Sequence, residues 1–231
     1  MRINICEMFH SIQGEGLLQG VPSVLVRLVG CNLSCDWCDT KDILQKGNYI
    51  SLNEQKLLEK LAIYNCKHII LTGGEPTIYE SLNDLIGVLH KNGYLVTVET
   101  NGTIQKELNC DLVSISPKLS NSIPQIFKGT TEEEEYNRKR INIDAIRCHI
   151  QSGKYQIKFV VGDSQEDFDE VKDILEQIGD YDRERVLIMP QAATIERLNE
   201  IQAEVARLCI CNNLRYSNRL QLQIWGNENE R

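Results

Sequence analysis

Three cysteines are the residues of this chain whose spacing indicates chemistry most directly. Cys31, Cys35 and Cys38 form the pattern CxxxCxxC within GCNLSCDWCDT. Thiolates are the usual ligands of iron-sulfur clusters, and a cluster that mainly transfers electrons is held by four cysteines. Three cysteines leave one iron free to bind a ligand that is not protein. The spacing therefore predicts a [4Fe-4S] cluster with one open iron.

A structural zinc site is the alternative interpretation of the same cysteines. Zinc would need a fourth Cys or His at a matching spacing to complete its tetrahedron. The four histidines are scattered, and Cys209 with Cys211 forms an isolated CxC far down the chain. On the cysteines alone, we favour the open cluster over zinc.

The surroundings of the cysteines resemble the radical S-adenosylmethionine (SAM) superfamily. The loop follows a strand-like segment at residues 22–30, Trp37 precedes the third cysteine, and GGEP follows at residues 73–76. In that superfamily the methionine moiety of SAM binds the open iron, and reduction yields a 5'-deoxyadenosyl radical. The resemblance implies a [4Fe-4S] cluster and SAM as cofactors.

A narrower resemblance runs densely from Met8 to Lys41 and then in patches to the end. Over these residues the sequence is similar to the 7-carboxy-7-deazaguanine synthases. These lyases contract the ring of 6-carboxy-5,6,7,8-tetrahydropterin with loss of ammonia, in the biosynthesis of deazapurines such as queuosine. The resemblance implies a carbon-nitrogen lyase that also uses Mg2+.

Apolar, β-branched runs alternate with segments of helical periodicity along the chain. The runs lack a clean polar alternation, which is typical of parallel strands covered on both faces. They are residues 24–28, 68–72, 94–100, 112–116, 155–161 and 185–190. Between them, Ser51 and Glu54 predict a capping box for a helix to about residue 64, and Asp163 or Ser164 opens another helix. A third spans about residues 194–208.

This alternation predicts an α/β fold with a parallel sheet, because right-handed crossovers return the chain to the same sheet. Six strands are too few for a closed eight-stranded barrel. We therefore expect an incomplete TIM-type barrel of about six parallel strands, a radical SAM core, in a single domain over residues 1–231.

The composition suits a cytoplasmic enzyme. No apolar leader follows Met1, and charged residues interrupt every hydrophobic run before it could cross a membrane. A net charge of -8 argues against binding nucleic acid through its phosphates. The other cysteines are expected to be ordinary small buried residues of a reducing compartment. They are Cys6, Cys66, Cys110, Cys148, Cys209 and Cys211.

Strand ends carry the residues that the resemblance assigns to SAM. Ligands of α/β sheets bind where strands end, and glycines there let the backbone approach closely, although a plain strand-to-helix turn also explains GG. Glu99 would accept hydrogen bonds from the ribose hydroxyls, and the SPK pattern at residues 116–118 would contact the nucleoside. The full set is Trp37, Asp39, Gly74, Glu75, Glu99, Ser116, Pro117, Lys118, Pro190 and Gln191.

The resemblance assigns the pterin mainly to the N-terminal loop. Arg27 lies in an otherwise apolar strand, where an unpaired charge would be costly. We expect its planar guanidinium to bind the 6-carboxylate of the substrate, with Glu99 as the alternative, internal partner. The predicted substrate residues are Ile12, Gln13, Gly14, Glu15, Arg27, Thr72 and Gln221.

Thr40 is the magnesium ligand that the resemblance implies. Mg2+ takes oxygen donors and keeps several waters, so one hydroxyl together with substrate oxygens forms a credible site. On base rates, a threonine beside such a loop is more often a turn residue.

One segment departs from the resemblance. These synthases commonly end in a pattern like RxSPQLH, whose histidine contacts the pterin, whereas this chain reads RYSNRLQLQIWG. Gln221 occupies the histidine position; it can donate and accept hydrogen bonds but cannot carry a proton's charge. Three explanations are open: Gln221 substitutes for the histidine, Gln223 does so, or the substrate differs.

Residues 130–150 form the compositionally unusual segment. Four glutamates precede Arg138, Lys139 and Arg140, an order that suits a helix dipole with Thr130 or Thr131 as N-cap. We expect a solvated helix face here, and a lid or a partner surface is the alternative.

Two other functions stay open on the sequence. One is a glycyl-radical activating enzyme that acts on a protein, although such enzymes commonly lack the QGEG segment and Thr40; the other is a zinc-binding module without activity. For the preferred function, the expected partners are a pterin substrate, flavodoxin or ferredoxin as reductant, and a second copy in a homodimer, with neither nucleic acid nor membrane. Lys118 and Glu15 are candidates for proton transfer, and no catalytic acid or base is assigned.

Overall fold

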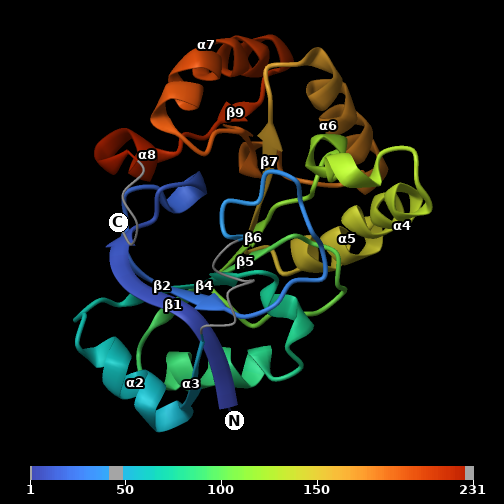
Figure 1. Ribbon diagram of the computed structural model, residues 1–231. Coiled ribbons are helices and arrows are strands. Elements are labelled where there is room, and N and C mark those ends of the chain that lie inside the picture. The colour runs from blue at the N-terminus through green and yellow to red at the C-terminus, as the bar shows by residue number, and fades with distance from the viewer. Residues whose placement is uncertain (1, 42–48, 227–231) are drawn as a thin grey trace.

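The computed structural model describes residues 2–41 and 49–226. Its strands form one curved sheet in the order β3-β1-β2-β4-β5-β6-β7-β8-β9 (Figure 1). The strands from β2 through β4 to β9 run parallel, whereas β1 is antiparallel to both of its neighbours. Their bounds are β1 Arg2–Ile12, β2 Pro22–Leu28, β3 Ile50–Asn53, β4 His68–Gly73, β5 Leu95–Thr100, β6 Leu112–Ile115, β7 Tyr155–Val161, β8 Val186–Pro190 and β9 Arg215–Tyr216.

The six parallel strands expected from the sequence are confirmed, as β2 and β4 to β8. Within the described residues the sheet is not closed, since β3 and β9 form its two edges. The incomplete barrel is therefore confirmed as well. Strands β1, β3 and β9 are not expected from the sequence. Two of these are very short, and β1 is only partly buried, so none has the continuous apolar run of a covered parallel strand.

Helices cover the outer face of the sheet (Figure 1). Alternate residues of each strand, such as Val24, Ile69 and Phe159, point to this face and form one core with apolar helix residues such as Phe168. The other residues of the strands face the inside of the curve. Within the described residues, the α-helices are α2 Glu54–Ala62, α3 Leu82–Lys91, α4 Thr131–Arg140, α5 Ile143–Gln151, α6 Gln165–Ile178, α7 Ile195–Asn212 and α8 Leu220–Trp225.

The helix starts expected from the sequence are right in two of three cases. Ser164 caps α6 by accepting a hydrogen bond from the amide of Asp167, and Thr194 caps α7. The capping box at Ser51 is wrong, because Ser51 lies in β3 and pairs with Asn4. Asn53 caps α2 instead and accepts from the amide of Lys56 at 2.9 Å.

The segment of residues 130–150 forms two helices, α4 and α5, with Asn142 as the N-cap of α5. Thr130 occupies the N-cap position of α4, but its hydroxyl donates to the carbonyl oxygen of Phe127. Most of α4 is exposed, as a solvated helix would be. Tyr136 is its buried residue, which the charge pattern did not indicate.

The cysteines outside the loop are less uniform than expected. Cys66, Cys110 and Cys209 are buried, whereas Cys6 and Cys148 are half-buried. Cys211 is exposed, because it lies on the solvent face of α7, so the expectation of burial is wrong for it. All nine cysteines are free thiols. Among the described helices, none has both the length and the apolar surface that a bilayer crossing requires.

Candidate active site

The cysteine loop follows the carboxyl end of β2 and carries three free thiols. Cys31 is exposed, Cys38 is half-buried and Cys35 is buried. The amide of Asp36 donates to the carbonyl oxygen of Ser122 at 2.9 Å, which fixes the loop against the segment after β6. Within the described ranges, no set of three His, Cys, Asp or Glu side chains surrounds a point where a single ion could bind. Three thiols on one loop are the donor set that a cluster needs, because each binds a different iron.

The glycines of GGEP bring the end of β4 against the root of this loop. Gly73 has φ 140°, and a Cβ on Gly74 would lie 1.9 Å from the carbonyl oxygen of Gly30. The amide of Glu75 donates to that same carbonyl at 2.9 Å. The strand end and the cysteine loop are therefore joined through backbone contacts that any side chain at Gly74 would break.

Glu75 is fully buried, and its carboxylate accepts hydrogen bonds from protein donors only. They are the amide and hydroxyl of Thr77, the hydroxyl of Thr100 and the amide of Asn101, at 2.6 to 2.9 Å. The Glu75 side chain thus orders the loop after β5. The amides of Gly74 and Glu75 donate to the carbonyl oxygens of Leu28 and Gly30, so the carbonyl oxygens are the backbone groups that residues 74 and 75 can offer to a ligand.

A row of polar side chains crosses the inner face of the sheet at neighbouring register positions. Hydrogen bonds join its members in pairs: Arg27 donates to Glu7 at 2.8 Å, Thr72 to Glu99 at 2.8 Å, and Gln156 to Ser114 at 2.7 Å. Because strand side chains alternate between faces, this row is separated from the apolar core by the sheet itself. The row is Glu7, Arg27, Thr72, Glu99, Ser114 and Gln156.

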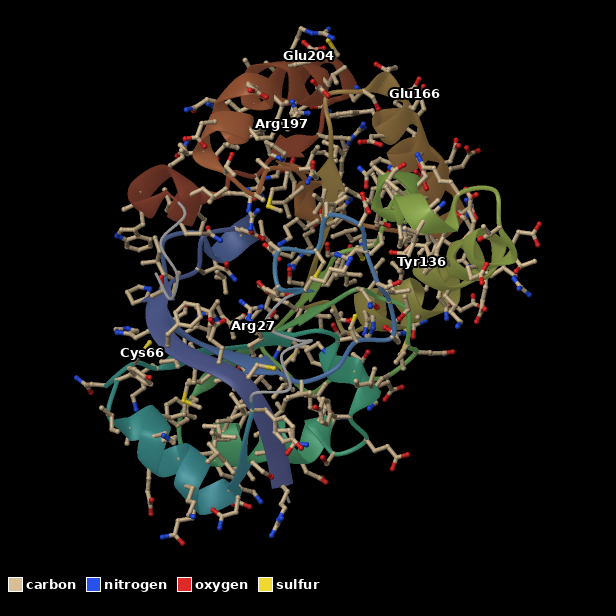
Figure 2. The ribbon with its side chains drawn as sticks, viewed as in Figure 1. Arg27, Cys66, Tyr136, Glu166, Arg197 and Glu204 are labelled. Carbon is tan, nitrogen blue, oxygen red and sulfur yellow. The ribbon has the colours of Figure 1, made fainter. Side chains whose placement is uncertain are left out.

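Arg27 pairs with Glu7 rather than with the alternative partner expected from the sequence, Glu99. The antiparallel register of β1 and β2 places Glu7 directly opposite Arg27. Glu7 accepts from the Nε atom, and the two Nη atoms of Arg27 have no partner among the described residues. Figure 2 labels Arg27 near the centre of the molecule. Half of its planar fork is therefore available for a carboxylate from a ligand.

The N-terminal loop lies over this row. Gln13 donates to Glu99 at 3.1 Å, the amide of Leu17 donates to Gln156 at 2.7 Å, and Gly16 donates through its amide to Ser217. The structure thus brings Gln13 and Thr72, both predicted to bind pterin, to the two carboxylate oxygens of Glu99. Glu99, predicted to bind the ribose, thus accepts hydrogen bonds from two residues predicted to bind the pterin.

Glu15 is held by two cations that the sequence analysis did not identify. Its carboxylate pairs with the ammonium of Lys158 on β7 and with Arg219, whose Nε lies 3.2 Å away. Arg219 also donates to Asp39 in the cysteine loop at 2.7 Å. Burial acts to raise the pKa of Glu15, but the charges of Lys158 and Arg219 outweigh it and lower this pKa to about 2. Glu15 is therefore an anion at neutral pH.

A signal for Lys158 was present in the sequence. It is a charged residue inside the apolar run 155–161, as Arg27 is inside its own strand. Gln156 and Ser114 had no such signal, because uncharged polar residues are common in strands. Arg219 follows a short strand in a loop, where arginine is unremarkable.

Gln221 lies in the first turn of α8 and packs against the N-terminal loop. A Cβ on Gly14 would lie 1.5 Å from the Oε1 atom of Gln221. The side-chain Nε2 atom of Gln221 donates to Glu15 at 3.4 Å. The Oε1 atom of Gln221 is buried and has no partner among the described residues. Gln223, the alternative, is exposed. Of the two glutamines, Gln221 is thus the one that faces the site, with an unused acceptor.

Two of the remaining residues predicted for SAM, Ser116 and Lys118, lie beside a third, Trp37. The ammonium of Lys118 lies 5.5 Å from the centre of the Trp37 ring and donates to Ser116 at 2.8 Å. Asn121, which the sequence analysis missed, accepts from the Trp37 indole at 3.0 Å. The other predicted positions lie at strand ends or in the loop: Ile12 at the end of β1, Pro117 after β6, Pro190 and Gln191 at the end of β8, and Thr40 beside Cys38.

Comparison with known proteins identifies the family of the chain. Residues 25–201 match the model of the radical SAM superfamily. A 7-carboxy-7-deazaguanine synthase from Halobacterium salinarum is 35% identical over 98% of this chain and 91% of its own length. The enzyme of that name from Rhodopirellula baltica is 36% identical over 96% of this chain and 86% of its own length.

A solved structure extends the likeness to the fold. The crystal structure of QueE from Escherichia coli superposes with a TM-score of 0.71 at 27% identity, and 95% of each chain is covered. SuiB from Streptococcus suis, with SAM bound, superposes with a TM-score of 0.52 at 15% identity, which shows a shared fold alone.

Proposed function

Since the chain belongs to the radical SAM superfamily and, within it, to the 7-carboxy-7-deazaguanine synthases, we propose that the inner face of its sheet binds 6-carboxy-5,6,7,8-tetrahydropterin and releases 7-carboxy-7-deazaguanine. The reaction is a ring contraction with loss of ammonia, so the enzyme is a carbon-nitrogen lyase. The observation that carries the substrate proposal is the half-free guanidinium of Arg27, which lies in the polar row that Gln13 and Glu15 cover. A carboxypterin presents a carboxylate for this fork, together with a donor and acceptor edge.

The superfamily implies a [4Fe-4S] cluster and SAM, and the residues that would hold them lie on one rim. Cys31, Cys35 and Cys38 would bind the cluster, and the backbone at Gly74 together with the group around Trp37 would bind SAM. When bound, these cofactors supply a 5'-deoxyadenosyl radical, which removes a hydrogen atom from the substrate. The chain's own task is to place the carbon of the pterin that carries the carboxylate next to that radical.

The polar row and the residues that lie over it would each bind a different part of the pterin. Arg27 would bind the carboxylate, and Glu7 holds the guanidinium through Nε, which leaves both Nη atoms for the ligand. Gln221 supplies an acceptor through its unpartnered Oε1 atom. Glu15, whose pKa is held low, accepts hydrogen bonds from the ring and is unsuited to donate a proton. No general acid is assigned to the loss of ammonia.

We propose Thr40 as the protein ligand of Mg2+. Thr40 is buried, and its hydroxyl lies 3.5 Å from the sulfur of Cys38, at the edge of the cysteine loop. One hydroxyl, waters and the substrate carboxylate would complete the oxygen shell. The Thr40→Ala variant should then lose the dependence of turnover on Mg2+ while it keeps its iron.

The reductant, the oligomeric state and the cellular compartment are proposed from the family. A flavodoxin or ferredoxin would reduce the cluster, two copies would form a homodimer, and the enzyme would work in the cytoplasm. The strands of the single sheet extend from Arg2 to Tyr216, which supports one domain for the whole chain. The product would enter queuosine or another deazapurine.

The test is an anaerobic assay with dithionite, SAM, Mg2+ and 6-carboxytetrahydropterin, with the product identified by mass spectrometry. Formation of 7-carboxy-7-deazaguanine supports the proposal. Iron-loaded protein that cleaves SAM but yields no such product contradicts it. The Arg27→Gln variant should raise KM by about a hundredfold for the loss of a charge-assisted pair of hydrogen bonds. Arg27→Lys should not restore it, because an ammonium cannot bind both oxygens in one plane.

A further inference from the structure

Tyr136 connects the exposed helix α4 to the cysteine loop. It is 5% exposed, whereas the rest of α4 lies largely in solvent. Its hydroxyl lies 3.1 Å from the sulfur of Cys35 and 3.2 Å from the hydroxyl oxygen of Ser122. Figure 2 labels Tyr136 on the α4 side of the molecule, to the right of Arg27.

The phenol has one proton and two acceptors within reach. Ser122 uses its own proton to donate to the carbonyl oxygen of Leu119 at 2.6 Å, so towards Tyr136 it can only accept. Cys35 is a thiolate when it binds iron, and hydrogen bonds to an ionised acceptor are roughly twice as strong as neutral ones. The proton of Tyr136 is therefore directed to Cys35.

The surroundings strengthen this contact. Cys35, Ile123 and Tyr136 form a small apolar cluster, which Leu33 and Phe127 cover. The ring of Phe127 lies 6.2 Å from that of Tyr136. A hydrogen bond in such a poorly solvated place is electrostatically stronger than one in water. The amide of Asp36 donates to the carbonyl oxygen of Ser122, which fixes the two acceptors, Cys35 and Ser122, relative to each other.

We propose that Tyr136 is a positioning residue that donates a hydrogen bond to the Cys35 thiolate and thereby raises the reduction potential of the cluster. Reduction adds one electron to [4Fe-4S]2+ and gives [4Fe-4S]+, with no proton transferred. Because the reduced state is the more negative one, a donor to a ligating sulfur stabilises it more, and hydrogen bonds to the sulfurs are among the determinants of the potential. The inference rests on the part of the proposed function that places the cluster on Cys31, Cys35 and Cys38, and it is independent of the substrate.

The test is a redox titration of the cluster-loaded protein, followed by electron paramagnetic resonance, with iron counted beforehand. In Tyr136→Phe the reduction equilibrium should become about tenfold less favourable, which is ~59 mV for one electron. Ser122→Ala removes the competing acceptor and should leave the potential unchanged or raise it. Tyr64→Phe is the matched control, because it loses a hydroxyl bound to the carbonyl of Met8, outside the cysteine loop, and should show no shift.

If Tyr136→Phe binds too little iron to be titrated, a fluorotyrosine at position 136 provides a second variant for the same redox titration. Its more acidic phenol is a stronger donor, so the potential should become more positive. An unchanged potential in fully loaded Tyr136→Phe overturns the inference and leaves the proposed function intact. An equal fall in Ser122→Ala also overturns it, since that result would indicate general loosening of the loop. A wild-type protein that binds no cluster would instead contradict the proposed function itself.

Discussion

Gly74 lies so close to Gly30 that a Cβ on Gly74 would also come within 2.8 Å of the Cβ of Cys31. The end of β4 therefore forms one wall of the cysteine loop. This contact gives GGEP a packing role in addition to the ligand role expected from the sequence, because backbone meets backbone there and no flexible side chain can move aside.

The first prediction follows from this contact. The Gly74→Ala variant should push the strand end away from the cysteine loop and retain severalfold less iron, with a stability loss of about 1–3 kcal/mol from overpacking. Iron content and urea unfolding measure the two effects. Gly87→Ala is the control, since a Cβ there meets nothing within 4 Å. Full iron in Gly74→Ala would contradict the assigned contact.

The second prediction concerns the buried ion pair of Glu15 and Lys158. Their side chains are 12% and 8% exposed, so Glu15→Gln leaves a buried ammonium without its main partner. The free energy of unfolding at pH 7 should fall by about 3 kcal/mol. The exposed pair of Glu135 with Lys139 provides the control, and Glu135→Gln should leave the free energy of unfolding nearly unchanged because solvent screens this pair. Equal losses in urea unfolding would argue against the pair.

The same ion pair makes the free energy of unfolding depend on pH in the acid range. The pKa of Glu15 is about 2 in the folded chain and near its ordinary 4.5 when unfolded, so the unfolded chain binds more protons between these values. The contribution of Glu15 is present above pH 4.5 and is lost as the pH falls towards 2. In urea unfolding at several pH values, Glu15→Gln should lack this part of the loss of stability at low pH.

The third prediction addresses Gln221. Gln221→Leu keeps the packing against Gly14 but removes the buried acceptor, together with the long 3.4 Å hydrogen bond to Glu15. KM for the carboxypterin should rise by about tenfold, the value of one hydrogen bond. SAM cleavage without substrate and iron content should not change. Gln223→Leu, an exposed change next to it in the helix, should behave as wild type. A KM that Gln221→Leu leaves unaltered would place the acceptor outside the substrate site.

The fourth prediction concerns His149 on α5. It is 1% exposed, and neither ring nitrogen makes a hydrogen bond of good geometry with the described residues. Burial lowers the pKa of His149 to about 4, which the nearby backbone of Ile104 offsets only in part. The unfolded chain therefore binds the extra proton between pH 6.5 and 4, and stability should fall by up to roughly 3 kcal/mol as the pH drops through this range.

His149→Met should remove this pH dependence and be as stable as the wild type at pH 7, since no hydrogen bond is lost. Urea unfolding at several pH values checks both points. The control is His10→Gln, an exposed change. A parallel fall in His149→Met and wild type between pH 6.5 and 4 would assign the effect to other groups.

Much of the architecture could be read from local patterns. The apolar runs of β2 and β4 to β8 are continuous because both faces of a parallel strand are covered, and such runs are visible without knowledge of their neighbours. The cysteine loop and GGEP are short segments whose chemistry depends on residues close together in the chain. Ser51 shows the limit, since its capping pattern was overridden by pairing with Asn4 across the sheet.

The sequence by itself therefore determined the parallel strands and the three thiols of one loop, because each depends on residues within a few positions of one another. Only the tertiary structure decided which side chains meet on the inner face. The pairing of Arg27 with Glu7 follows from strand register, and that of Glu15 with Lys158 spans 143 positions. The contact of Tyr136 with Cys35 depends on how α4 packs over the loop. Register and packing are set by the whole sheet and its covering helices, so no local pattern encodes them.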